Sequence, residues 1–415
     1  MRLEFGFGQG EQIVELPEKN LLGILLPNLV KKRMTGEEEV FRAIEEPIGT
    51  RRLRDIVKPG ERVVIVTSDI TRPLPTYRLM PIVLDELYAA GVNAKDTVLV
   101  FALGIHRPHT DEERKSLAGE RAFSEIVCID GDNTDCVRFG MTSRGTPVDI
   151  IRLVAEADRR ICLGNIEYHY FAGYSGGAKA IMPGVSTHEA IQNNHCRMVE
   201  TAACAGRIEG NPVREDIEEA SAMVGIDFIV NVVLDEHKEI LRAFTGHHIA
   251  AHREGCAFLD ELYLKTISER ADIVLVSQGG APKDLNLYQT QKALDNAKHA
   301  IKKGGIIILI GSCKEGMGES VFEEWMTTSD SAVCMIERIK QDFVLGGHKA
   351  AAIAMVLQDA DIYLVSEMAD SFVKKMFLKP YSDAQQALDA AFEKFGPDAT
   401  VIAMPYGGST LPRVK

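Results

Sequence analysis

Residues 164–195 read GNIEYHYFAGYSGGAKAIMPGVSTHEAIQNNH. A short apolar run at 160–163 precedes this stretch and predicts a buried strand, and a helical pattern begins near Thr187. Glycine costs backbone entropy and brings no side chain to pack, so the glycines between them indicate tight turns or a ligand close to the backbone. Binding and catalytic residues concentrate in loops on a rigid scaffold. We therefore predict that this strand, loop and helix form the centre of an active site.

Apolar runs on either side of this stretch predict an α/β chain. Val63–Val66 and the ADIVLV run at 271–276 have the pattern of strands that are buried on both faces, which is typical of parallel sheets. Because this rhythm of strands and helices occurs twice, we expect two α/β domains with mostly parallel sheets and an active-site cleft between them. The predicted domains are 1–265, which binds the cofactor, and 266–400. The tail at 401–415 is expected to return to the first domain.

Charge and composition exclude several classes of partner. The chain has 415 residues and a formal net charge of −13, which argues against nucleic acid or an anionic membrane as a partner. No apolar stretch reaches the roughly 18 residues of a membrane helix, and the N-terminus has no apolar leader. The eight cysteines are scattered without a C-x-x-C pair, which is typical of reduced thiols. A cytoplasmic protein is expected.

Two other predicted strands end in polar loops, SDITRP at 68–73 and GIHRPHT at 104–110. In open parallel sheets ligands bind at the carboxyl ends of the strands, so these loops and the 164–195 stretch are expected to converge. His106 directly follows a strand end and is a candidate acid/base, with an ordinary loop histidine as the alternative. The planar fork of Arg72 suits a carboxylate or a phosphate, although a structural salt bridge is common.

The glycine loop that ends at Lys179 is not a Walker-type phosphate loop. That motif needs Gly directly before the Lys and a hydroxyl directly after it, whereas Ala178 and Ala180 occupy these positions. A structural turn with a solvated lysine is the alternative. His188 and His195 are seven residues apart on one predicted helix, about 10 Å at 1.5 Å per residue, which is too far to chelate one metal ion. His195 is then a single metal ligand or a helix-end residue.

A pair of polar residues in the second half of the chain could complete a site. Gln289 and Lys292 are three residues apart on a predicted helix and share one face. This pattern is that of an ordinary exposed face, but opposite a cleft it could hold a small carboxylate. Tyr288 and Trp325 are candidates for the wall of a pocket, with core packing as the alternative role for Trp325.

Together these blocks resemble the nickel-pincer lactate racemase family. The resemblance rests on five separate motifs in the expected order over most of the chain: SDITRP (68–73), GIHRPHT (104–110), HYFAGYSGGAKAIMPG (169–184), NNH (193–195) and YQTQK (288–292). It implies an isomerase, a racemase or epimerase of 2-hydroxy acids with two α/β domains. A combination of motifs in order is far more specific than any one of them.

The resemblance also implies a cofactor and a role for each matching residue. The cofactor is a nickel-pincer nucleotide, a pyridinium dithio mononucleotide that binds Ni(II) through two sulfurs and a ring carbon. Lys179 matches the residue that tethers it, and His195 matches the fourth nickel ligand. His106 and His169 match the two acid/base residues. Cofactor binding falls on Asp69, Tyr174, Gly176 and Gly177, and substrate binding falls on Arg72, Gln289 and Lys292.

Physical chemistry agrees with this implied assignment. A pincer plus one imidazole gives the four ligands that suit square-planar Ni(II), so one protein histidine is enough. Backbone N–H groups of the glycine loop could form a concavity for the nucleotide phosphate. Hydride transfer avoids a carbanion beside a carboxylate, and one acid/base is needed on each face of the substrate.

Alternatives to the racemase remain open at the level of the sequence. The first is a zinc-dependent hydrolase that uses His106, His109 and His195. The second is a nucleotide- or metabolite-binding protein without catalysis of its own. Proteins that make or insert the cofactor are possible partners. Neither the substrate among 2-hydroxy acids nor the oligomeric state follows from the sequence.

Overall fold

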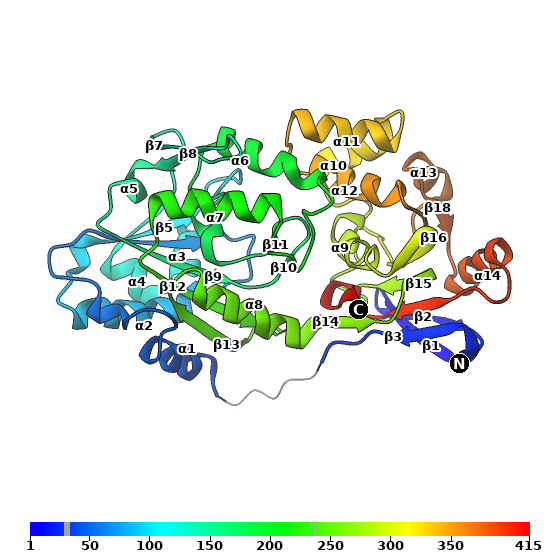
Figure 1. Ribbon diagram of the computed structural model, residues 1–415, viewed down its shortest axis with the longest axis horizontal. Coiled ribbons are helices and arrows are strands. Elements are labelled where there is room, and N and C mark those ends of the chain that lie inside the picture. Colours follow the sequence, from blue (N-terminus) through cyan, green and yellow to red (C-terminus); the bar gives the residue numbers. More distant parts are fainter. Residues whose placement is uncertain (29–33, 236) are drawn as a thin grey trace. The chain divides into compact units, whose positions relative to one another are not determined.

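Runs of β-branched and other apolar residues form two separate sheets, one mostly and one fully parallel. The computed structural model describes residues 1–28, 34–235 and 237–415, and Figure 1 shows their helices and strands. The chain divides into two compact units. One is Val30–Asp260, and the other combines Met1–Leu29 with Glu261–Lys415. None of the helices in the described ranges is long and apolar enough to cross a membrane.

The unit Val30–Asp260, called the inserted unit below, is built on a six-stranded sheet in the order β13-β12-β9-β4-β5-β6. Neighbouring strands are parallel except for β12 and β13. The strands are β4 (Val63–Ser68), β5 (Thr97–Ala102), β6 (Val127–Asp130), β9 (Arg159–Asn165), β12 (Phe228–Leu234) and β13 (Ile240–Gly246). Two short hairpins accompany the sheet: β7 (Cys136–Met141) with β8 (Pro147–Ile151), and β10 (Tyr168–His169) with β11 (Gly173–Tyr174).

Helices of this unit bury their apolar faces on the sheet. Leu79 and Val83 of the second helix pack with Ile65 and Leu99 of the sheet in one fully buried core. The helices are α1 (Gly36–Glu45), α2 (Thr76–Ala89), α3 (Asp111–Ala118), α4 (Glu120–Glu125), α5 (Arg152–Ala155), α6 (His188–His195), α7 (Pro212–Val224) and α8 (Ala250–Tyr263). The chain runs from β4 outward through β5 to β6 and then returns to place β9 on the other side of β4. The switch point of the topology therefore lies between β4 and β9, where ligands bind in open α/β sheets.

The other unit, called the split unit, has a six-stranded, fully parallel sheet in the order β18-β17-β16-β15-β19-β3. Its strands are β3 (Leu21–Ile24), β15 (Ala271–Ser277), β16 (Ile301–Ile310), β17 (Ala360–Val365), β18 (Lys379–Tyr381) and β19 (Val401–Met404). Its helices are α9 (Leu287–Ala297), α10 (Ser320–Thr328), α11 (Ala332–Gln341), α12 (Gly347–Leu357), α13 (Asp370–Lys375) and α14 (Ala384–Phe395). Trp325 is fully buried, which confirms a packing role for it.

The predicted domain assignment is corrected at both ends of the chain. Residues 1–29 were expected in the first domain, but β3 pairs with β19, and the hairpin of β1 (Arg2–Phe7) and β2 (Gly10–Glu15) adds Leu3 and Phe5 to the core of the split unit. The tail was expected to return to the first domain. Instead β20 (Leu411–Val414) pairs with β14 (Leu264–Ile267) inside the split unit. Both errors have one cause, because pairing between strands so distant in sequence leaves no local pattern.

Candidate active site

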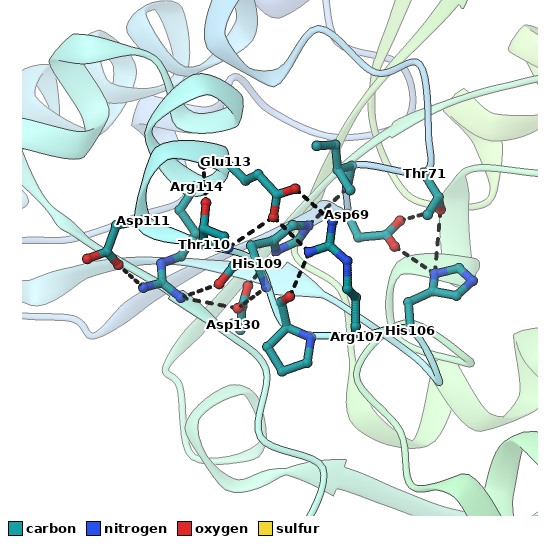
Figure 2. Close-up of polar contacts among 12 residues, drawn as sticks. Asp69, Thr71, His106, Arg107, His109, Thr110, Asp111, Glu113, Arg114 and Asp130 are labelled. Atoms are coloured by element: carbon teal, nitrogen blue, oxygen red, sulfur yellow. Dashed lines mark hydrogen bonds and ion pairs between the residues drawn. The ribbon is translucent and has the colours of Figure 1, made fainter.

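An aspartate and a histidine meet where β4 and β5 end. Nδ1 of His106 lies 2.6 Å from Oδ2 of Asp69, and the Thr71 hydroxyl donates to Oδ1 of Asp69 at 2.7 Å (Figure 2). Asp69 is buried and His106 is partly exposed. Since a carboxylate only accepts, Nδ1 of His106 carries a proton and Nε2 is left to exchange protons with a substrate. This is the arrangement of an oriented general base.

Opposing effects act on the Asp69 carboxyl. Burial works to raise its pKa, but the hydrogen bond and charge of His106, with help from Thr71 and Arg72, outweigh burial and hold the pKa below its usual range. Asp69 is therefore a carboxylate at neutral pH. Its contacts are with the candidate base, whereas the sequence predicted a contact with the cofactor, which stays a prediction.

The second histidine of the GIHRPHT motif has a structural role. His109 is buried, and its Nδ1 lies 2.6 Å from Oδ1 of Asp130, while its Nε2 accepts the Ile70 N–H at 3.0 Å (Figure 2). Both ring nitrogens are thus used in holding the loop that carries Asp69. This arrangement gives no support to the zinc site considered above, which needed His109 as a ligand.

The rest of this motif forms a helix cap. Thr110 and Glu113 make a reciprocal capping box at the start of α3, as the acidic first turn predicts (Figure 2). The hydrogen bond from Arg107, together with the Thr110 N–H, lowers the pKa of Glu113 to about 2. Arg107 therefore supports the cap, and the motif combines one candidate base with structural residues.

The glycine loop follows β9 and turns through the short hairpin of β10 and β11. Gly173 has φ +77°, and a Cβ there would lie 2.0 Å from the Arg207 carbonyl oxygen. Gly176 has φ +72°, and its Cβ would lie 2.7 Å from Oδ1 of Asn231. Both positions therefore require glycine. The predicted row of free N–H groups is not observed, because the N–H groups of Tyr174, Ser175 and Gly177 bond to Ala172, Glu167 and Asn231.

Three predicted residues of the 164–195 stretch gather around one aromatic ring, that of Phe171. The rings of His169 and His195 lie edge-on to it with centroids 4.5 Å and 4.9 Å away, and Nζ of Lys179 lies 6.0 Å from its centroid. Phe171 is buried, and no special role was predicted for it. Its position in the HYFAGY motif, two residues after a candidate base, was the only available signal.

Cations and burial dominate the electrostatics of this cluster. Burial, followed by the charges of Arg72 and Arg214, holds the pKa of Lys179 well below that of an ordinary lysine. Burial and the charge of Lys179 likewise hold the pKa of His169 well below its usual range. Nδ1 of His169 accepts the Ala172 N–H at 3.3 Å, so its neutral ring carries the proton on Nε2. A neutral imidazole is expected here at pH 7, and the Lys179 amine is shifted toward its neutral form.

Arg72 connects the two loops electrostatically. Its charge contributes to lowering the pKa of Asp69 on one side and those of His169 and Lys179 on the other. The guanidinium is exposed at the start of the turn that follows β4. An exposed Arg whose charge acts on both a candidate base and a partly buried lysine is well placed to meet an anionic substrate.

The two histidines of α6 lie in different surroundings. His188 is exposed at the start of the helix, whereas His195 is buried at its end, with Nδ1 2.8 Å from Oδ1 of Asn194. Among the residues placed in the structure, no group of three or more His, Cys, Asp and Glu side chains could hold a metal ion. His195 is consistent with a site in which the protein supplies one ligand.

Arg214, which was not predicted from the sequence, donates hydrogen bonds to the backbone of the glycine loop. This fully buried residue of α7 donates from Nε to the Ala172 carbonyl at 3.1 Å and from Nη2 to the Tyr174 carbonyl. The Tyr174 side chain is also buried, and its hydroxyl bonds to Asp260 at 2.8 Å. The contacts of Tyr174 therefore stabilise the loop, and its predicted cofactor role stays untested. A lone Arg in an amphipathic helix carries no signal of such a role.

Gln289 and Lys292 lie on α9 of the split unit. Asn286 caps this helix by accepting the Gln289 N–H at 3.0 Å, and Gln278 donates to the Gln289 carbonyl at 2.9 Å. The Gln289 side chain is partly exposed, and Lys292 is exposed. The inserted unit thus brings together the other predicted residues, and the contribution of α9 stays a prediction.

Comparison with known proteins gives concordant matches over both units. Residues 7–206 match the family model of the lactate racemase N-terminal domain, and residues 266–411 match that of the C-terminal domain. The chain is 34 % identical to the lactate racemase of Thermoanaerobacterium thermosaccharolyticum over 426 residues, with 100 % of this chain and 99 % of the relative covered. It is 30 % identical to that of Lactiplantibacillus plantarum over 405 residues, with 95 % of each covered.

Solved structures show the same similarity. The lactate racemase apoprotein from T. thermosaccharolyticum matches with a TM-score of 0.88 at 32 % identity, over the full length of both chains. A protein from Thermotoga maritima matches with a TM-score of 0.64 at 19 % identity, over 94 % of this chain and 100 % of that one. The second match concerns the fold alone.

Proposed function

The chain belongs to the lactate racemase family and is an isomerase, and on this premise we propose that it interconverts the enantiomers or epimers of a lactate-like 2-hydroxy acid. The observation that carries the proposal lies in the inserted unit. His169, Lys179 and His195 surround Phe171, and the charge of Arg72 acts both on this cluster and on Asp69, the partner of His106.

The residues present fit the nickel-pincer nucleotide that the family resemblance implies. A partly buried amine with a lowered pKa has more of the neutral, nucleophilic form than an ordinary lysine, which suits Lys179 as the tether. His195 presents one imidazole, which suits an ion whose other ligands come from the cofactor. Gly176 leaves room where a side chain would collide with Asn231. When bound, the cofactor would supply a reversible hydride acceptor.

His106 and His169 are proposed to hold and move the hydroxyl proton, one on each face of the substrate. The Asp69 carboxylate accepts the Nδ1–H of His106, which leaves the lone pair on Nε2 to receive a proton. His169 is neutral in its cation-rich surroundings, with its proton on Nε2. Each proton transfer of this kind contributes about 10²–10⁴ to the rate.

Arg72 is proposed to hold the substrate carboxylate while the substrate reorients and presents its other face. Gln289 and Lys292 of α9 are proposed to contact the same substrate. Gly177 and Tyr174 support the loop that presents Lys179, through Asn231 and Asp260. Proteins that make and insert the cofactor are proposed as the partners of this chain.

The test uses protein produced together with the cofactor-making proteins. Each pure enantiomer of a panel of 2-hydroxy acids is incubated in D₂O, and the products are separated by chiral chromatography and mass analysis. We expect interconversion of at least one pair, without solvent deuterium at C2, and a mass adduct on Lys179. Loaded protein that interconverts no member of the panel would overturn the catalytic proposal. Deuterium at C2 would overturn hydride transfer while leaving a racemase.

A double variant, H106N/H169N, separates catalysis from binding. We expect it to retain the adduct on Lys179 and about one nickel per chain, which one histidine ligand implies, while turnover is lost. Turnover that survives in the double variant would exclude both histidines from catalysis.

A further inference from the structure

We propose that Asn194 and Asp216 are positioning residues that fix the tautomer and the direction of the His195 ring. The inference rests on the proposed function, in which His195 binds the metal, but its central claim concerns hydrogen bonds within the chain. His195 ends α6, Asn194 precedes it, and Asp216 lies on α7. All three are buried, with exposed fractions of 7 %, 0 % and 0 %.

The amide of Asn194 has only one orientation that satisfies its neighbours. Its Nδ2 lies 3.1 Å from the carbonyl oxygen of Val213 and 2.8 Å from Oδ2 of Asp216. Both atoms are acceptors, so the NH₂ group faces them and Oδ1 faces His195, 2.8 Å from its Nδ1. Because Oδ1 can only accept, Nδ1 of His195 carries the ring proton. The lone pair that a metal ion needs is therefore on Nε2.

Both carboxylate oxygens of Asp216 accept hydrogen bonds. Its Oδ1 accepts from the Thr142 hydroxyl at 2.5 Å, and its Oδ2 accepts from the Thr146 hydroxyl at 2.6 Å. The Thr142 oxygen accepts the Thr146 N–H at 3.1 Å, which directs the Thr142 proton toward Asp216. Both threonines lie in the turn between β7 and β8. A buried carboxylate with three donors keeps its place, and it holds the Asn194 amide in turn.

This series of carboxylate, amide and imidazole has the form expected around a metal-binding histidine. Such histidines usually donate their other ring N–H to a carboxylate or a carbonyl, which fixes the tautomer and raises the basicity of the ligand. Here the amide of Asn194 stands between His195 and Asp216 and transmits the polarisation. The Phe171 ring meets His195 at an interplanar angle of 70°, which restrains the plane of the imidazole. The ligand is thus oriented by the protein before any metal arrives.

The first test needs neither the cofactor nor a variant. Full-length apoprotein labelled with ¹⁵N in its histidine rings is studied by NMR at about pH 8, above the ordinary histidine range. The His195 signals are assigned by their loss in H195Q. We expect the Nδ1–H tautomer. A predominant Nε2–H tautomer would overturn the proposal.

Two variants then test the contributions of Asn194 and Asp216. N194L removes the acceptor, so we expect the His195 ring to populate Nε2–H and the nickel affinity of loaded protein to fall about 10–100-fold. D216N replaces the charged acceptor of the Asn194 NH₂ group by a neutral amide and so weakens one of the two contacts that hold it; a smaller rise in Nε2–H is expected. N193L is the matched control, because the Asn193 amide donates to the Glu189 carbonyl at 3.0 Å and lies outside the series. N194L that retains the wild-type tautomer and affinity, or D216N that leaves the tautomer unchanged, would overturn the corresponding part.

The experiment separates failure of this inference from failure of the proposed function. Circular dichroism and thermal melting identify any variant that does not fold. If a variant does not fold, the tautomer measured in the wild-type apoprotein still tests the proposal. If the tautomer responds to N194L but H195Q binds nickel as wild type does, the positioning of the ring stands and His195 as metal ligand is overturned.

Discussion

Two regions of the inserted unit treat the same residue type in opposite ways. In the loops after β4 and β5, His106 and His109 each have a carboxylate 2.6 Å from Nδ1. In the glycine loop, His169 receives a backbone N–H, and the nearest charges that act on it are those of Lys179 and Arg72. We call these the acidic region and the cationic region. In the acidic region a carboxylate accepts the ring N–H, whereas in the cationic region burial and nearby cations keep the imidazole of His169 neutral, so the partner decides what each histidine can do.

The largest effect is expected when His169, the candidate acid/base of the cationic region, is replaced. H169N should lower kcat in both directions by about 10²–10⁴, because one proton transfer is lost. The measurement is turnover of each enantiomer by loaded protein. H188N is the control, since His188 is exposed at the start of α6. An H169N rate within a factor of three of wild type would contradict the role of His169.

The stability of the cationic region should depend on Arg214. R214L leaves the Ala172 and Tyr174 carbonyls without their charged donor, and we expect a loss of about 2–4 kcal/mol in the free energy of unfolding. Urea denaturation of the apoprotein measures it. R253L is the control, because Arg253 pairs at its partly exposed end with Glu218 and should cost about 1 kcal/mol or less. Equal losses in the two variants would contradict a special role for Arg214.

In the acidic region, D69N should reduce kcat/KM by about 10–100-fold. A charge-assisted hydrogen bond contributes about 1.5–3 kcal/mol, and its loss leaves His106 poorly oriented. D132N is the control, because Asp132 is exposed and bonds only locally to Thr134. A fall in Lys179 adduct instead of turnover would favour the cofactor role that the sequence predicted for Asp69.

The pH dependence of stability sharpens the comparison. Burial and nearby cations lower the folded-state pKa of His169, so between that pKa and about 6.5 the unfolded chain binds more protons. Stability contributed by the neutral ring is therefore complete above about pH 6.5 and is lost as pH falls. Below about pH 6.5, H169N should reduce the slope of the free energy of unfolding against pH by up to about 1.4 kcal/mol per pH unit. His252, whose pKa burial also lowers, remains in the variant and keeps a residual slope. An unchanged slope in urea titrations would contradict the assignment.

The sequence predicts features whose signal is local or topological. Buried apolar runs identify β4 and β15, and the Thr110 capping box identifies the start of α3. Motif order identifies the family. Other features carry no such signal. Asp69 contacts His106, 37 positions away, and Arg214 contacts Ala172, 42 positions away. The position of the Phe171 ring depends on the direction of its side chain. No local pattern encodes these, so the sequence did not predict the contact of Asp69 with His106 or the role of Arg214.

Strand β3 has a consequence for biosynthesis. Leu21 of β3 pairs with Val401 of β19, so β3 waits for a partner that is made 380 residues later. At about 5–20 residues per second this interval is roughly 20–75 s. The inserted unit has its own sheet and core, so it can fold during that time. Limited proteolysis of stalled nascent chains that end before β19 should therefore cleave residues 1–28 and spare the inserted unit. The split unit is the last part of the chain to gain its full sheet, and until then β3 is an unpaired strand exposed to chaperones and to aggregation.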